Sequence, residues 1–239
     1  MNKWDEKAKN YARYTENEDG FEANVLKVLN VDFSKKTVLD IGCGTGVYTI
    51  RIAKKALRVD AIDSSKGMLD VLEQDAKRLN ISNITIKHTS WSDFHIKNTK
   101  YDFAISTMSP AVSEEDDFIK MDKCAKVKIY LGWAGVRDNE ILESLFAEHG
   151  SVYKSPNGAK RIEDWLKKNN KQYRQELFRE ERVTNRNLQE AIENFSWHLE
   201  IRGLIPQKEL IKKILQKYSL PNGYIQDKTI SHMKLLVWE

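Results

Sequence analysis

The chain has 239 residues, of which 41% are hydrophobic and 31% charged, and 39 Lys and Arg against 35 Asp and Glu give a formal net charge of +4. This composition suits one globular domain, or one domain with a sizeable insertion, and excludes a disordered chain. No apolar run is long enough to span a membrane. Residues 1–6 are charged and lack the apolar core of a secretory signal, so we expect a cytoplasmic protein that does not bind membranes.

The chain contains two cysteines, Cys43 and Cys124. No second Cys or His stands at metal-ligand spacing from either of them. We therefore expect neither a disulfide framework nor a structural metal site.

The predicted elements begin with helices within residues 1–30. From Thr37 to about Gly132, short apolar runs alternate with amphipathic stretches, which is typical of a parallel sheet covered by helices on both faces. The predicted strands are Thr37–Ile41, Arg58–Ile62, Ile84–His88, Phe103–Met108 and Val127–Gly132. Helices are expected after Gly46, Lys66 and Glu114.

Beyond Gly132 the composition shifts toward lysine-rich helical stretches. Two further strands are predicted at Tyr173–Val183 and Thr229–Trp238, which makes seven in a mainly parallel sheet. Between them, two helices separated by a turn at residues 203–206 form an insertion at about residues 184–219. Because open α/β sheets bind ligands at one end of the sheet, we expect this insertion to be a helical lid. The whole chain, 1–239, is expected to be a single domain with its ligand-binding core at 35–132.

The strongest motif is a buried strand that runs into a glycine-rich turn, Val38-Leu39-Asp40-Ile41-Gly42-Cys43-Gly44-Thr45-Gly46. Glycines are needed where the backbone turns sharply and a ligand comes close. The spacing differs from the dinucleotide fingerprint, and no Gly-Lys-Ser/Thr follows, so phosphate binding is disfavoured. Asp40 would repel a pyrophosphate and favour a ligand with an ammonium or sulfonium charge.

A second acid, Asp63, closes the next predicted strand. A carboxylate at this position can accept hydrogen bonds from both hydroxyls of a ribose. The two motifs together predict a ligand that contains a ribose and no phosphate.

With these motifs, the segment from Val38 to Ala111 resembles the Rossmann-like, class I S-adenosylmethionine-dependent methyltransferases. The resemblance implies a three-layer sandwich whose last strand is antiparallel. It also implies S-adenosylmethionine as cofactor, S-adenosylhomocysteine as product and no metal.

In that family the glycine turn contacts the methionyl part of the cofactor, and the acid after the second strand binds the ribose. Met68 corresponds to the residue beside the adenine, and Asp93 to the acceptor of its amino group, with Ser92 or Phe94 beside the ring. The cofactor-binding positions that the resemblance implies are Asp40, Gly42, Cys43, Gly44, Gly46, Asp63, Ser64, Met68, Ser92, Asp93, Phe94 and Thr107.

The loop after the fourth strand, Ser109-Pro110-Ala111-Val112, is similar to that of methyltransferases acting on base amino groups but departs from it at Ala111 and Val112. Without an aromatic residue nothing stacks a flipped base, which favours a small-molecule acceptor. One alternative is an RNA methyltransferase acting on ribosomal or transfer RNA, because Lys154–Arg186 holds ten basic residues against five acidic. A third hypothesis is a protein that binds the adenosyl cofactor without catalysis.

Methyl transfer from a sulfonium needs alignment and a dry pocket, and a general base only if the acceptor arrives protonated. No cluster in the sequence marks such a base. The candidates are Tyr11, Tyr130, Trp133 and His198, because the end of the fifth strand and the insertion should border the acceptor. Tyr11, Trp4 and Tyr14 lie in a segment that resembles the N-terminal helices covering the cofactor in the family. Their aromatic faces would attract the sulfonium cation. The alternative role for these three residues is ordinary packing of a helix against the sheet.

Overall fold

The computed structural model describes residues 3–96 and 101–239, so Met1, Asn2 and residues 97–100 of the predicted ranges lie outside it. Contacts between residues divide the chain into two compact units. The first unit comprises Met1–Ala134, Asn157–Phe178 and Met233–Glu239, and the second comprises Gly135–Pro156 and Arg179–His232.

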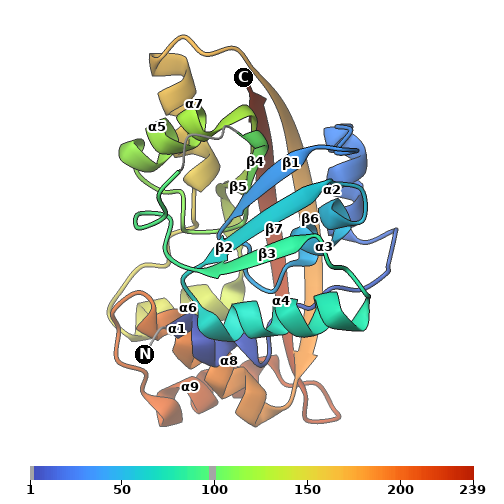
Figure 1. Cartoon of the computed structure of the whole chain (residues 1–239). Helices are drawn as coiled ribbons and strands as arrows, with labels where there is room; N and C mark the ends of the chain where they lie inside the picture. Colours follow the sequence, from blue (N-terminus) through green and yellow to red (C-terminus); the bar gives the residue numbers. More distant parts are fainter. Residues whose placement is uncertain (1–2, 97–100) are drawn as a thin grey trace. The chain divides into compact units, whose positions relative to one another are not determined.

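Seven strands form the sheet, in the order β3-β2-β1-β4-β5-β7-β6 (Figure 1). The strands are β1 Thr37–Ile41, β2 Arg58–Asp63, β3 Ile84–His88, β4 Tyr101–Thr107, β5 Ala125–Asp138, β6 Tyr173–Arg186 and β7 Ile225–Trp238. β1 pairs in parallel with both β2 and β4, so Asp40 lies opposite Ala61 and Ile105. Parallel pairing brings the carboxyl ends of these strands to one edge of the sheet. The predicted α/β class and the mainly parallel seven-stranded sheet are confirmed.

β5 extends six residues beyond the predicted end at Gly132, to Asp138. A Cβ built at Gly132 would lie 2.5 Å from the ring of Tyr130 in the same strand. Gly132 therefore serves close packing inside a continuing strand and does not mark a turn. β6 and β7 are also longer than predicted, because β6 continues to Arg186 and β7 begins at Ile225.

The helices form where the sequence predicted them and in the lysine-rich region as well. Their bounds are α1 Lys3–Ala8, α2 Phe21–Leu29, α3 Val47–Ala53, α4 Lys66–Arg78, α5 Glu115–Cys124, α6 Glu140–Glu148, α7 Gly158–Lys168, α8 Leu188–Glu200 and α9 Lys208–Leu215, with a short 3-10 helix, η1, at Gln216–Tyr218. α8 and α9 are the two helices predicted between the last two strands. Their role as a lid stays a prediction.

Two apolar layers enclose the sheet of the first unit, because successive residues of a buried strand point to opposite faces. Leu39 packs in one cluster with Phe118 of α5 and Trp165 of α7. Its neighbour Val38 packs in the other cluster with Leu29 of α2. This double covering explains why the parallel strands read as continuous apolar runs.

The second unit has its own core, formed by apolar residues of α6, α8 and α9. Buried Asn139 caps α6, because its side-chain oxygen accepts a hydrogen bond from the Leu142 N–H at 2.8 Å. Its amide group donates to the side chains of Asp227 and Thr229, each at 2.6 Å. One polar side chain thus ties the start of α6 to β7.

Both cysteines are buried free thiols. Across residues 3–96 and 101–239, no helix is long and apolar enough to cross a membrane. Within the same residues, no group of three or more His, Cys, Asp or Glu side chains is placed to hold a metal ion.

Asp102 joins three strands at the end of the sheet away from the glycine turn. It accepts hydrogen bonds from the Thr37 N–H and hydroxyl, each at 3.0 Å, and from Lys126 Nζ at 3.0 Å. The Thr37 N–H, followed by Lys126, lowers the pKa of Asp102 to about 2.

A carboxyl with a lowered pKa stabilises the fold above its unfolded pKa, and this stability disappears as the pH falls toward the folded value. Between pH 5 and about 2.5, we expect the wild type to lose about 1–2 kcal/mol more unfolding free energy than Asp102→Asn. Urea denaturation at several pH values measures both proteins. Identical acid dependence would show that Asp102 contributes no pH-dependent stability.

Candidate functional site

The glycine turn after β1 is held against the next strand by backbone hydrogen bonds. The N–H groups of Gly42 and Cys43 both donate to the Ile62 carbonyl, at 2.9 and 3.0 Å. Gly42, Gly44 and Gly46 have φ values of +69°, +54° and +83°, in the left-handed region that favours glycine. The turn then opens α3, which begins at Val47.

The three glycines differ in what surrounds them. A Cβ built at Gly42 would lie 1.9 Å from Ser109 Oγ, and one built at Gly46 would lie 2.3 Å from Leu72 Cδ1. At Gly44 a Cβ would meet none of the described atoms within 4 Å. Gly42 and Gly46 are therefore required for packing, whereas the backbone at Gly44 is open to a ligand.

Asp63 bridges the two loops at this edge of the sheet. Its Oδ2 accepts a hydrogen bond from the Gly44 N–H at 2.9 Å, and its Oδ1 accepts one from the Ser65 N–H at 2.8 Å. Burial raises the pKa of Asp63 above its usual value, although the N–H donors of Ser65 and Gly44 oppose the shift. The carboxyl thus fixes the glycine turn relative to the loop after β2.

Asp40, the last acid before the turn, is only 1% exposed. Its Oδ2 accepts a hydrogen bond from the Thr49 hydroxyl at 2.6 Å. Its Oδ1 is buried and has no hydrogen-bond partner among the described residues. Burial raises the pKa of Asp40 to about 7, so the fixed negative charge expected from the sequence is only partly present at neutral pH.

The loop after β2 leads into α4 through Ser65, whose hydroxyl caps the helix by accepting from the Met68 N–H at 3.2 Å. The Ser64 carbonyl lies 3.1 Å from Nε2 of His88 at the end of β3. The Met68 side chain is buried in the first turn of α4. Ser64 follows Asp63 directly, and Met68 lies in the helix that this loop begins; their contacts with a cofactor stay a prediction.

After β3, a serine hydroxyl organises the next loop. Ser90 Oγ donates to Asp93 Oδ2 at 2.6 Å and lies 2.7 Å from the Ser92 hydroxyl. Asp93 and Ser92 are exposed, but Phe94 is buried and stacks on Trp91, with ring centroids 6.1 Å apart. Phe94 is thus a core residue in this structure, because an exposed phenyl ring would leave apolar area in water.

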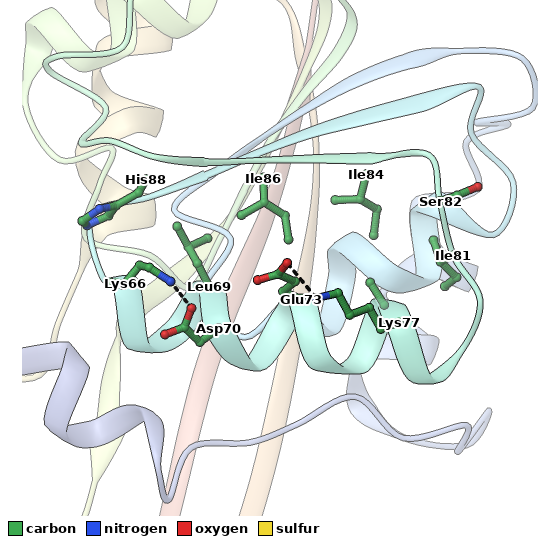
Figure 2. A pocket seen from close by; sticks show the side chains of 11 residues that line it. Lys66, Leu69, Asp70, Glu73, Lys77, Ile81, Ser82, Ile84, Ile86 and His88 are labelled. Atoms are coloured by element: carbon green, nitrogen blue, oxygen red, sulfur yellow. Dashed lines mark hydrogen bonds and ion pairs between the residues drawn. The ribbon is translucent and has the colours of Figure 1, made fainter.

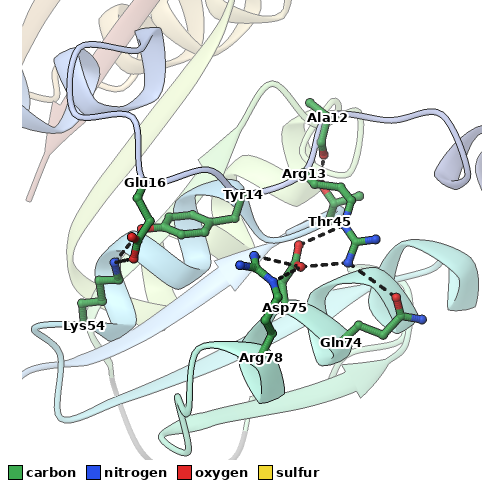
Figure 3. Close-up of polar contacts among 9 residues, drawn as sticks. All are labelled: Ala12, Arg13, Tyr14, Glu16, Thr45, Lys54, Gln74, Asp75 and Arg78. Carbon is green, nitrogen blue, oxygen red and sulfur yellow. Dashed lines mark hydrogen bonds and ion pairs between the residues drawn. The ribbon is translucent and has the colours of Figure 1, made fainter.

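Residues 3–18 form a segment, here named the N-terminal strap, which contacts both loops. Asp5 Oδ1 accepts hydrogen bonds from the Ser65 hydroxyl at 2.7 Å and from the Gly67 N–H at 2.9 Å. The Thr45 hydroxyl, within the glycine turn, donates to the Ala12 carbonyl at 2.5 Å (Figure 3). The strap is therefore attached to the same two loops that Asp63 bridges.

Charged and aromatic contacts hold the rest of the strap on α3 and α4. Arg13 donates to both carboxylate oxygens of buried Asp75, at 2.8 and 3.2 Å (Figure 3). Burial by itself raises the pKa of Asp75, but the guanidinium groups of Arg13 and Arg78 together outweigh it, and the pKa is lowered. Buried Tyr14 accepts a hydrogen bond from Lys54 Nζ at 2.6 Å, with the Arg51 guanidinium 5.1 Å from its ring centroid.

The four candidate acceptor-side residues occupy different places. Tyr11 is 37% exposed and meets Trp4 edge to face, with ring centroids 6.2 Å apart. Trp133 is partly buried against the cluster that covers the α2 and α3 face. His198 lies on α8 in the second unit, 5.1 Å from Trp197 between ring centroids.

Tyr130 is a core residue. A Cβ built at Gly158, the first residue of α7, would lie 2.5 Å from the Tyr130 hydroxyl. Burial raises its pKa to about 12, so the phenol stays protonated near neutral pH. In this position the side chain packs β5 against α7 and is poorly suited to act as a base.

Sequence reasoning missed several residues that shape the loops. Ser65 carries a local signal, because a serine before an amphipathic helix is a common N-cap. Thr49 and Asp5 carry none: Thr49 reaches Asp40 only once α3 packs on β1, and Asp5 lies sixty residues before the serine that it contacts.

A separate cavity of about 470 Å³ lies between α4 and the edge strand β3 (Figure 2). Apolar side chains including Leu69, Ile84 and Ile86 form its wall. Along α4, Lys66 is paired with Asp70, and Lys77 with Glu73. None of the three glycines of the turn lines this cavity, so it is distinct from the loops described above.

Residues 38–127 match a family model described as a methyltransferase domain. An uncharacterized protein of Haemophilus influenzae is 35% identical over 130 residues, which cover 53% of this chain and 47% of that protein. The cypemycin N-terminal methyltransferase of a Streptomyces species is 52% identical over 44 residues, 18% of this chain and 17% of that enzyme. The chain therefore spans at most about half the length of these curated relatives.

Among solved structures, the YcgJ protein of Bacillus subtilis has the same fold, with a TM-score of 0.61 and 12% sequence identity. The similarity covers 91% of this chain and 97% of that protein. At this identity the likeness shows the fold, and residues 38–127 supply the match at the level of sequence.

Proposed function

We propose that this chain, whose residues 38–127 belong to the methyltransferase-domain family, is an S-adenosylmethionine-dependent methyltransferase with a small-molecule acceptor. The observation that carries the proposal is the pair of loops at the carboxyl edge of β1 and β2. Gly44 leaves its backbone open, and Asp63 holds that backbone beside the loop after β2. An open glycine backbone beside a carboxylate can receive the methionyl and ribose parts of the cofactor.

The residues present fit the cofactor in two respects. Asp40 buries a carboxylate oxygen that has no partner within the described residues, which suits a ligand carrying positive charge. Asp63 keeps lone pairs free for ribose hydroxyls, since each of its oxygens can accept more than one hydrogen bond. When bound, the cofactor supplies a methyl group that is already activated, so the protein's part is alignment and exclusion of water.

A small-molecule acceptor is favoured over RNA because the basic stretch Lys154–Arg186 is largely neutralised within the protein. Eight of its ten basic residues are in ion pairs with acids. For example, Lys167 pairs with Glu163 at 2.6 Å and Lys171 with Asp122 at 2.7 Å. The stretch is also divided between the two units. Neutralised cations release few counterions and hold a phosphate backbone weakly.

The similarity to the cypemycin N-terminal methyltransferase extends over only 44 residues of this chain. We take from it support for methyl transfer and not the identity of the acceptor. A cytoplasmic location is part of the proposal, because both thiols are free, as in a reducing compartment.

Thermal stability in the presence of S-adenosylmethionine, S-adenosylhomocysteine or NAD tests the cofactor. Both adenosyl compounds should raise the unfolding free energy by about 2.7 kcal/mol at a hundredfold excess over Kd, and NAD should not. A shift with NAD alone would contradict the assignment. Binding of both adenosyl compounds, with no methylated product from any small-molecule or RNA pool, would favour a non-catalytic binding protein.

RNA binding distinguishes the two acceptor classes. We expect only weak binding of transfer or ribosomal RNA, with Kd no tighter than ~10⁻⁶ M near physiological salt. Fluorescence anisotropy between 50 and 200 mM salt measures it, and Lys160→Glu/Arg161→Glu serves as the comparison. Tight binding that weakens steeply with salt, and that this variant reduces, would favour the RNA methyltransferase.

A further inference from the structure

The buried Asp40 carboxyl has too few hydrogen-bond donors around it to stabilise its ionised form. Of its two carboxylate oxygens, only Oδ2 is satisfied, by the Thr49 hydroxyl at 2.6 Å. Oδ1 is buried without a partner in the part of the chain that the structure describes. An ionised carboxylate normally requires several donors when it is removed from water.

A neighbouring negative charge increases this cost. Asp63 at the end of β2 acts on Asp40 as a second negative charge, whereas burial raises the pKa of the nearby Cys43 thiol, which stays uncharged. On β2 and β4, the residues paired with Asp40 are Ala61 and Ile105, and the residue of α3 that contacts it is Thr49. Burial accordingly raises the pKa of Asp40 to about 7, with Asp63 adding to the shift.

We propose that at mildly acidic pH Asp40 holds a proton while the site is empty and releases it when a sulfonium-bearing cofactor binds, so that this carboxyl distinguishes the charged methyl donor from its uncharged thioether product. The inference rests on the proposed function, because it requires S-adenosylmethionine at the glycine turn. It assigns to Asp40 a specificity role in addition to the family position at the methionyl group.

The charge balance of the exchange is simple. One positive charge enters with the sulfonium, and one proton leaves Asp40 for the buffer, so the net charge of the buried site is unchanged. After methyl transfer the sulfur is a neutral thioether, and the carboxylate has lost its partner. Loss of the sulfonium charge removes the attraction that held the donor, so the product is held less tightly, and Asp40 takes a proton back.

Calorimetry in two buffers of different ionisation enthalpy counts the protons directly on the wild-type protein. With S-adenosylmethionine we expect about one proton released at pH 6, half a proton at pH 7 and almost none at pH 8. The affinity should rise about tenfold between pH 6 and pH 8. With S-adenosylhomocysteine the affinity should change less than threefold over the same range.

Asp40→Asn is the matched variant, because asparagine keeps the shape and the oxygen that accepts from Thr49. Its affinity for S-adenosylmethionine should lose the tenfold pH dependence, and any titration of the ligand itself is the same in both proteins. Asp60→Asn, a buried acid of β2 that pairs with Lys87, should keep the wild-type dependence.

Binding of S-adenosylmethionine with no proton release at pH 6 would overturn the inference and leave the proposed function intact. Absence of binding by either adenosyl compound would overturn the proposed function itself. If Asp40→Asn does not fold, the proton count on the wild type still decides the question.

Discussion

Replacing Gly42 with alanine is expected to destabilise the protein by about 2–4 kcal/mol. Gly42 has φ +69°, where a Cβ is strained, and that Cβ would lie 1.9 Å from Ser109 Oγ and 2.9 Å from the Ala111 Cβ. The loop after β4 must move for the alanine to fit, which disturbs packing as well as the turn. Urea denaturation of the purified variant gives the change in unfolding free energy.

Gly44→Ala is the matched control, since Gly44 also has a positive φ but open surroundings. It should cost only the backbone strain, roughly 1–2 kcal/mol. Its affinity for S-adenosylmethionine should nevertheless fall at least tenfold, because the added methyl group occupies the space left for the ligand. Equal loss of stability in both variants would contradict the difference in packing, and unchanged affinity in Gly44→Ala would contradict the placement of the ligand.

Asp63→Ala is expected to weaken the binding of S-adenosylmethionine by about 1.5–3 kcal/mol, or roughly 10- to 150-fold. The carboxyl would be lost as an acceptor for the ribose hydroxyls. The variant also loses the two hydrogen bonds from the Gly44 and Ser65 N–H groups, so both loops become less ordered before any ligand arrives. Isothermal titration calorimetry measures the affinity.

Asp60→Ala separates binding from folding for that measurement. Asp60 lies in the same strand but pairs with Arg58 at 3.0 Å and with Lys87 at 2.8 Å, and it accepts from the Tyr101 hydroxyl at 2.8 Å. Its loss should reduce the unfolding free energy by about 1–3 kcal/mol and leave the affinity within twofold of the wild type. If Asp63→Ala binds as tightly as Asp60→Ala, Asp63 does not contact the cofactor.

The bounds of a strand were predictable where burial alone determines its pattern of apolar residues. β1 has the predicted bounds, because a parallel strand buried on both faces needs a continuous apolar run. The edge strand β3 also has the predicted bounds, although none of its residues is fully buried. The end of β5 was not predictable, because Gly132 resembles a terminator and is in fact a small residue beside the Tyr130 ring. The sequence does not distinguish a glycine that ends a strand from one that permits close packing within it.

The residues of the site that follow consecutive strands were predictable from the sequence, whereas those that reach the site through tertiary contacts were not. The glycines and Asp63 occupy fixed places after consecutive strands, so spacing alone brings them together. Asp5 reaches Ser65 only through tertiary contact, and Thr49 reaches Asp40 only through the packing of α3. The burial of Tyr130 was likewise not predictable from its place in the chain: the end of a strand predicted a role in the site, and the contacts that bury the side chain come from other elements.

The division of the chain has a consequence for the order of folding during synthesis. Residues 233–239 belong to the first unit, where Leu235, Leu236 and Trp238 are buried, although residues 179–232 before them belong to the second. During synthesis, all residues of the second unit are therefore made before the last residues of the first unit's core. Until then the exposed apolar face of the sheet needs protection from aggregation, and removal of these seven residues should impair the first unit more than the second.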